Sequence, residues 1–170
     1  MPKLELVTAE VCPFAQRNHM TLLEKNLEFE LREVDLDNKP NWFEPISPYS
    51  KVPVLCHGNI RVYESAIINE YLEESFPERR LLPDDPGKRA NARIWIDFDN
   101  TKFIPIFYKL LLAQEASLQK MLVAEMTERL VFLDQDGFSS ASEGPYWFGQ
   151  KLSLVDLSLY PHFERFLKVS

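Results

Sequence analysis

Cys12 stands where the sequence passes from an expected strand into an expected helix. Residues 4–7, Leu-Glu-Leu-Val, are mostly apolar and suit a strand buried in a sheet, and Pro13 suits the first turn of a helix, where its missing N–H costs nothing. A thiol at such a junction faces unpaired backbone N–H groups and the positive end of the helix dipole, which both stabilise a thiolate over a thiol. Because the thiolate is the nucleophile of disulfide exchange, Cys12 is the predicted catalytic residue. The alternative is a small buried hydrophobic side chain.

The dithiol motif Cys-x-x-Cys is absent, because Ala15 takes the place of the second cysteine. A mixed disulfide at Cys12 must then be released by an outside thiol, which favours exchange with a small cellular thiol. Cys56 lies in an apolar run and is expected to be inert core. The histidines have no Cys, Asp or His at ligand spacing, so we predict no metal. No permanently bound cofactor is expected either.

Two further junctions have residues suited to binding a peptide-like ligand. Pro53 at the entry to a strand predicts a cis peptide that turns the backbone of Val52 outward, where it would pair with a ligand as an extra strand; the alternative is an edge-strand or turn proline. Glu64 and Ser65 begin a helix directly after a strand, so the Ser65 hydroxyl and the first N–H groups suit a carboxylate, or form a plain N-cap. Lys51 would supply a positive charge to a second carboxylate, or be solvated.

The elements that position these residues fill the first half of the chain. A strand, a helix over about residues 13–26 and a half-buried strand over 29–34, with Leu31 on its buried side, predict a βαβ unit with parallel strands. Residues 52–56 and 60–63 predict an antiparallel hairpin, because Gly58 and Asn59 between them form a tight turn. A helix follows from residue 64.

Beyond residue 77 the pattern becomes helical. Residues 90–113 predict one long helix bent at Pro105, and residues 118–133 predict a second. Ser153 and Asp156 have the spacing of a capping box at the start of a third helix. The buried stripe expected on the second helix is Met121, Leu122, Met126, Leu130 and Leu133.

These patterns predict an α/β domain followed by an all-α domain. The expected boundaries are residues 1–77 for the first domain, 78–87 for a proline-rich linker and 88–170 for the helical domain.

Composition excludes several classes of function. The net charge of −7 argues against sequence-independent binding of nucleic acid and against anionic membrane surfaces. No apolar run approaches the roughly 20 residues needed to span a bilayer, and acidic Glu5 comes too early for a secretory signal. With only 2 cysteines in the chain there is no disulfide framework, which fits a reducing cytoplasmic location.

Three motifs in this order resemble those of the cytosolic glutathione transferases. They are Cys-Pro-Phe-Ala-Gln-Arg at residues 12–17, Lys-Val-Pro-Val-Leu at 51–55 and Glu-Ser-Ala-Ile at 64–67. The cysteine motif is similar to that of the omega, lambda and dehydroascorbate reductase groups, and residues 81–86 and 153–156 are similar to the family's linker and capped core helix. The resemblance implies a thioredoxin-like glutathione-binding domain followed by a helical domain. The chain ends soon after the capped helix, where the family adds further helices.

The resemblance also implies the roles of individual residues. Cys12 would form a mixed disulfide with glutathione, the Val52 backbone would pair with its cysteinyl part, Glu64 and Ser65 would hold the γ-glutamyl end, and Lys51 the glycyl carboxylate. The complete set of residues implied to bind glutathione is Phe14, Lys51, Val52, Pro53, Glu64 and Ser65.

The function implied is a cysteine-type glutathione transferase acting as thioltransferase, dehydroascorbate reductase or deglutathionylating enzyme, with glutathione as co-substrate and a small electrophilic or disulfide substrate. The alternatives are conjugation of glutathione to electrophiles and a non-enzymatic regulatory or scaffold protein, such as a relative of the chloride intracellular channels. No nucleic acid or membrane partner is expected. Related groups include monomers and dimers, so a homodimer remains an open alternative.

Overall fold

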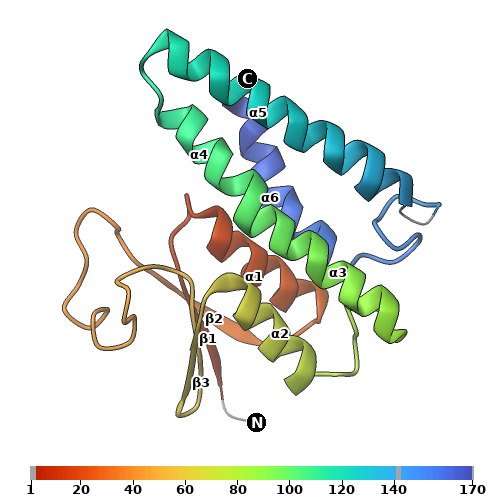
Figure 1. Ribbon diagram of the computed structural model, residues 1–170. Helices are drawn as coiled ribbons and strands as arrows, with labels where there is room; N and C mark the ends of the chain where they lie inside the picture. Colours follow the sequence, from red (N-terminus) through yellow and green to blue (C-terminus); the bar gives the residue numbers. More distant parts are fainter. Residues whose placement is uncertain (1–2, 141–142, 170) are drawn as a thin grey trace. The chain divides into compact units, whose positions relative to one another are not determined.

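The computed structural model describes residues 3–140 and 143–169 of the chain (Figure 1). The chain forms two compact units, Met1–Arg80 and Leu81–Ser170. The first unit contains a mixed four-stranded sheet and two helices, and the second contains helices, as the sequence predicts.

The sheet of the first unit has the strand order β2-β1-β3-β4. The bounds of the strands are Leu4–Thr8 for β1, Phe29–Glu33 for β2, Val54–His57 for β3 and Ile60–Tyr63 for β4. Strands β1 and β2 pair in parallel and β3 pairs antiparallel with both β1 and β4, which confirms the predicted βαβ unit and hairpin. Gly58 adopts φ 59° in the hairpin turn, a value that glycine tolerates without a steric cost.

Helices α1, Pro13–Glu24, and α2, Ser65–Ser75, lie side by side on one face of this sheet (Figure 1). Alternate residues of β1 point toward them, because successive side chains of a strand face opposite sides. A hydrophobic core forms between the two layers. Its buried members are Leu4, Leu6, Leu22, Leu55, Ile68, Leu72 and Phe76.

The connection between β2 and β3 covers the opposite face of the sheet. Phe43 from this connection is fully buried and packs with Val7 of β1 and Val54 of β3. The connection therefore has a hydrophobic anchor of its own, and its end, residues 47–53, leads directly into the candidate site.

Leu31 lies opposite Leu6 in the register, on the face of the sheet that packs against the helices, as the alternation predicts. It is nevertheless 44% exposed, because β2 is an edge strand, so the expectation that its side chain is buried is wrong. The neighbouring Arg32 is half-buried instead, with its guanidinium carbon 3.3 Å from the centre of the Trp42 ring.

The long helix predicted over residues 90–113 is divided into three joined pieces. Helix α3, Pro86–Phe98, continues into a π-helical turn, Asp99–Phe103, and then into α4, Ile104–Leu112. In the widened turn the N–H of Ile104 donates to the carbonyl of Asp99. The turn lies just before Pro105, which has no N–H to donate to the preceding turn of an α-helix.

Helix α5, Ala116–Phe132, follows and buries a narrower stripe than predicted. Leu122 and Met126 are buried, whereas Met121 is 63% exposed, so its placement in the stripe is wrong. A second π-helical turn, Leu133–Gly137, and a short 3₁₀ turn, Phe138–Ser140, end this part of the chain. Leu133 is buried as predicted.

Helix α6, Leu154–Val169, begins at a closed capping arrangement. The Asp156 carboxylate accepts hydrogen bonds from the Ser153 N–H at 2.8 Å, the Ser153 hydroxyl at 2.6 Å and the Trp147 N–H at 2.9 Å. The predicted capping role of Asp156 is confirmed, with the serine hydroxyl bonded to the carboxylate itself. No helix within residues 3–140 and 143–169 is long and apolar enough to cross a membrane.

Candidate active site

Cys12 is the residue immediately before α1 and is half-buried. Its N–H donates to the Ala9 carbonyl at 2.9 Å, and its own carbonyl accepts the first helical hydrogen bond, from Gln16, at 3.1 Å. Its side chain makes no capping hydrogen bond to the helix. The Cys12 Sγ lies 3.8 Å from the carbonyl oxygen of Val52, so the thiol at the helix start faces the backbone that precedes β3.

The Val52–Pro53 peptide bond is cis, as the sequence predicts. The approach to it is fixed by Ser47, which is buried. The Ser47 hydroxyl donates to the Lys51 carbonyl at 2.7 Å and accepts from the Lys51 N–H at 2.9 Å. One hydroxyl therefore holds both backbone groups of Lys51, while the Lys51 side chain remains exposed.

Helix α2 begins at an unusual backbone position. Glu64 is exposed and has φ 69° and ψ 117°, a left-handed value that side chains other than glycine rarely adopt. Its side chain makes no capping hydrogen bond, while its carbonyl accepts from the Ile68 N–H at 2.9 Å. Ser65 is buried, and its hydroxyl accepts from the Arg17 guanidinium at 3.2 Å.

All six residues predicted to bind glutathione line one cavity of about 130 Å³ in the first unit. Phe14 comes from α1, Lys51, Val52 and Pro53 from the segment before β3, and Glu64 and Ser65 from the start of α2. Cys12 does not line this cavity. Its sulfur lies 3.8 Å from the carbonyl oxygen of Val52, which is one of the lining residues.

Sequence analysis missed three residues that line the same cavity, namely Ser47, Tyr49 and Tyr63. The two tyrosine rings meet edge to face with their centres 5.3 Å apart. Tyr63, the last residue of β4, directly precedes Glu64, so its position near the site could have been predicted from the sequence. Tyr49 and Ser47 lie in a connection whose residues show no periodicity. Ser47 reaches the site because its hydroxyl bonds to the backbone of Lys51, four residues further along the chain.

Cys56 provides the contrasting thiol. It lies in β3, is half-buried rather than part of the core, and makes no disulfide. Burial raises the pKa of the Cys56 thiol, and the nearby Glu5 carboxylate raises it further. The protonated form is therefore favoured at neutral pH, which fits the predicted lack of reactivity. Within the described residues no group of three or more His, Cys, Asp or Glu side chains is arranged to hold a metal ion.

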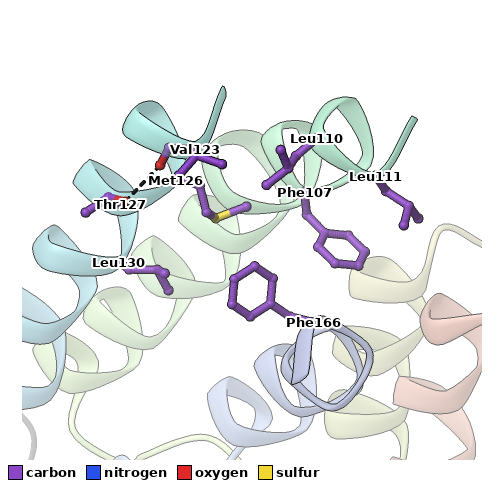
Figure 2. Close-up of a pocket in the computed structure, with 8 residues that line it drawn as sticks. All are labelled: Phe107, Leu110, Leu111, Val123, Met126, Thr127, Leu130 and Phe166. Atoms are coloured by element: carbon purple, nitrogen blue, oxygen red, sulfur yellow. Dashed lines mark hydrogen bonds between the residues drawn. The ribbon is translucent and has the colours of Figure 1, made fainter. Parts of the chain in front are cut away.

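The second unit contains a different kind of cavity. It has a volume of about 420 Å³ and lies among α4, α5 and α6 (Figure 2). Its lining is Phe107, Leu110, Leu111, Val123, Met126, Thr127, Leu130 and Phe166. The one hydroxyl among these side chains, that of Thr127, donates to the Val123 carbonyl of its own helix at 2.8 Å. This groove therefore presents hydrocarbon, sulfur and aromatic surface.

Comparison with known proteins gives the family of the chain. The family model described as "Glutathione S-transferase, N-terminal domain" matches residues 6–80. Glutathione S-transferase omega-1 of Mus musculus is 32% identical over 170 residues, an alignment that covers 96% of this chain and 67% of that protein. The chain belongs to the glutathione S-transferase family. The omega-class match places it in the cysteine-type group that its residues 12–17 resemble.

Solved structures of the family have the same fold. Glutathione transferase Omega 3C from Trametes versicolor is 35% identical, with a TM-score of 0.88 over 97% of this chain and 73% of that one. Rice GST1, solved in complex with glutathione, is 34% identical, with a TM-score of 0.82 over 92% of this chain and 73% of that one. The predicted thioredoxin-like α/β and all-α fold class is thereby confirmed. The chain spans about two thirds of the length of the curated relatives it matches.

Proposed function

We propose that this chain is a glutathione-dependent thiol transferase or reductase that works through a mixed disulfide at Cys12. The observation on which this mainly rests is the 3.8 Å distance between the Cys12 sulfur and the Val52 carbonyl. A cysteinyl residue that paired with the Val52 backbone as an added strand would bring its own sulfur close to Cys12.

The charges and donors around the cavity suit the two ends of glutathione. The start of α2 offers the Ser65 hydroxyl and first-turn N–H groups without a capping side chain, which suit the carboxylate of the γ-glutamyl end. The exposed Lys51 suits the glycyl carboxylate, and Phe14 covers the remaining apolar side. The left-handed backbone of Glu64 supports a binding role, since such conformations persist mainly where function requires them.

The proposed reaction has two steps. The Cys12 thiolate attacks the glutathione sulfur of a mixed disulfide, the sulfur–sulfur bond breaks, and the departing thiolate takes a proton. The thiolate of a second glutathione then attacks the glutathione sulfur on Cys12, which releases oxidised glutathione and restores the Cys12 thiolate. Overall, one mixed disulfide and one glutathione become the free thiol of the substrate and one oxidised glutathione, so no further cofactor is required.

The two units would divide the work in this proposal. Residues 1–77 would bind glutathione, residues 78–87 would serve as the linker, and residues 88–170 would contact the second substrate, a small disulfide or electrophile. Omega-class relatives and a solved structure with glutathione support a glutathione-dependent function at the level of the family. A cytoplasmic location is part of the proposal, because a reactive free thiol at Cys12 fits a reducing compartment best.

The test is the intact mass of the protein after incubation with oxidised glutathione. The parent should gain one glutathionyl group, the Cys12→Ser variant none, and the Cys56→Ser variant one. Equal labelling of the parent and the Cys12→Ser variant would contradict the proposal. An unlabelled parent that conjugates glutathione to a chloronitrobenzene acceptor would indicate the conjugating alternative.

A further inference from the structure

Arg17 is a charged residue buried next to the candidate site. It lies on α1, five residues after Cys12, and its exposure is 0%. Burial removes water from the guanidinium, which is costly unless protein groups replace that water. Two of the contacts that replace it are known: the guanidinium donates to the Ser65 hydroxyl at 3.2 Å, and its carbon lies 5.3 Å from the centre of the Phe14 ring.

Both of these contacts are with residues that line the cavity. Phe14 belongs to α1 and Ser65 to α2, so one buried cation touches cavity walls from two helices. The main chain of Ser65 is fixed from α1 as well, because Asn18 Nδ2 donates to the Ser65 carbonyl at 2.8 Å.

The chemistry of the Arg17–Ser65 hydrogen bond determines what the serine offers to a ligand. A guanidinium only donates, whereas a hydroxyl has one hydrogen and two acceptor positions. Because Arg17 occupies an acceptor position of the Ser65 oxygen, the hydroxyl hydrogen stays available to donate. The buried charge and the dipole of α2 both favour an anion at that point over a neutral group.

We propose that Arg17 is a positioning residue for an anionic ligand group. It orients the Ser65 hydroxyl toward the α-carboxylate of the γ-glutamyl end of glutathione and holds the Phe14 ring at the side of the cavity. This role rests on the proposed function and adds a residue that does not itself line the cavity.

Lys25, the residue that directly follows α1, provides a matched control between the same two helices. Its side chain is 1% exposed, and its ammonium lies 2.7 Å from the Glu73 carboxylate of α2 and 2.6 Å from the Arg79 carbonyl. None of these residues lines the cavity. Lys25 therefore bridges α1 and α2 as Arg17 does, but away from the ligand.

The experiment measures the affinity for two ligands by calorimetry. One is S-methylglutathione, which cannot form a disulfide, and the other is the same compound with its γ-glutamyl α-carboxylate converted to a carboxamide. For Arg17→Gln we expect Kd for S-methylglutathione to rise about tenfold or more and Kd for the amide to change less than twofold. The reason is that only the carboxylate ligand forms the charge-assisted hydrogen bond that the substitution weakens. Lys25→Met should lower Tm and leave both Kd values within twofold of the parent.

Equal losses of affinity for both ligands in Arg17→Gln would show a merely structural role and overturn the inference. Should Arg17→Gln not fold, Arg17→Lys keeps the charge but not the forked donor, and the preference for the carboxylate over the amide should fall at least threefold. An unchanged preference would overturn the inference while leaving the proposed function intact. Failure of the parent to bind S-methylglutathione would instead overturn the proposed function, and this role with it.

Discussion

Helices α1 and α2 of the first unit begin differently from helices α3 and α6 of the second unit. In the first unit, α1 and α2 follow Cys12 and Glu64, whose side chains make no capping hydrogen bond. In the second unit, the Asp85 carboxylate accepts from the Lys88 N–H at 2.8 Å at the start of α3, and Asp156 accepts from the Ser153 N–H at 2.8 Å at the start of α6.

This difference separates helix starts suited to ligands from helix starts that serve the fold. First-turn N–H groups lack partners within the helix and need a side chain, water or a ligand. In α3 and α6 the protein supplies the side chain, which stabilises the fold. In α1 and α2 it supplies none, and the residues at both starts adjoin the cavity that we propose binds glutathione.

The largest effect should come from the start of α1. Cys12→Ser replaces the sulfur nucleophile by a hydroxyl that does not exchange with disulfides, so thioltransferase activity should fall on the order of 10³-fold or more. The measurement is the rate of reduction of a glutathionylated substrate with glutathione as reductant.

Cys56→Ser is the matched control, since it removes the other thiol. Its activity should stay within twofold of the parent, because the raised pKa of Cys56 keeps that thiol protonated at neutral pH. Alkylation of Cys56 by iodoacetamide should accelerate steadily between pH 7 and 9, as the thiolate fraction grows. Activity that disappeared with Cys56 and survived without Cys12 would reverse the assignment.

A closed helix start of the second unit should affect stability instead. Asp156→Ala leaves the N–H groups of Ser153 and Trp147 without their acceptor, so the free energy of unfolding should fall by about 2–4 kcal/mol. Denaturant unfolding measures this loss. The glutathione adduct should form on the folded variant at a rate within twofold of the parent. A large loss of that rate would contradict the claim that this helix start serves stability alone.

Two serines at helix starts allow a more closely matched comparison. Ser65→Ala should weaken binding of S-methylglutathione about tenfold, because it removes one hydrogen bond to a carboxylate. Ser153→Ala should cost about 1 kcal/mol of stability and leave that affinity unchanged. Calorimetry measures Kd for S-methylglutathione, and denaturant unfolding measures the free energy of unfolding, for each of the two variants. Weakened binding in Ser153→Ala with normal binding in Ser65→Ala would refute the distinction.

The smallest effect is expected at Lys51. Its side chain is exposed, and an exposed ion pair contributes at most about 1 kcal/mol, so Lys51→Met should raise Kd for S-methylglutathione about two- to fivefold. The effect should shrink with added salt, because salt screens exposed charges. Lys120→Met, at an exposed position of α5, is the control and should show no change at any ionic strength.

Much of the fold was predictable because its signals are local. The alternation of apolar residues, the Gly58–Asn59 turn and the cis peptide before Pro53 depend on neighbours in the sequence. The exposure of Leu31 and Met121 was not predictable, because it depends on which element lies at the sheet edge and which helix faces are covered. The π-helical turn before Pro105 was predicted only as a bend, since a proline disrupts a helix without specifying how the chain accommodates it.

The residues of the candidate site likewise include some that were predictable from the sequence and some that were not. Cys12, Glu64 and Ser65 stand at junctions of strand and helix, so their grouping at one end of the sheet follows from the order of the elements. Tyr49 reaches the cavity through a connection whose path is fixed by the burial of Phe43, a tertiary contact that no periodicity reveals. The uncapped start of α2 and the closed cap at Ser153 were likewise indistinguishable in sequence, because Ser65 and Ser153 both suit an N-cap.

The most direct test is a crystal structure of the protein after incubation with oxidised glutathione. We expect a disulfide between Cys12 Sγ and a glutathionyl group whose cysteinyl main chain pairs with Val52 and whose γ-glutamyl carboxylate accepts from the Ser65 hydroxyl. A glutathionyl group on Cys56, or glutathione bound away from Val52 and Ser65, would contradict the central claim that Cys12 and the start of α2 together form a glutathione site.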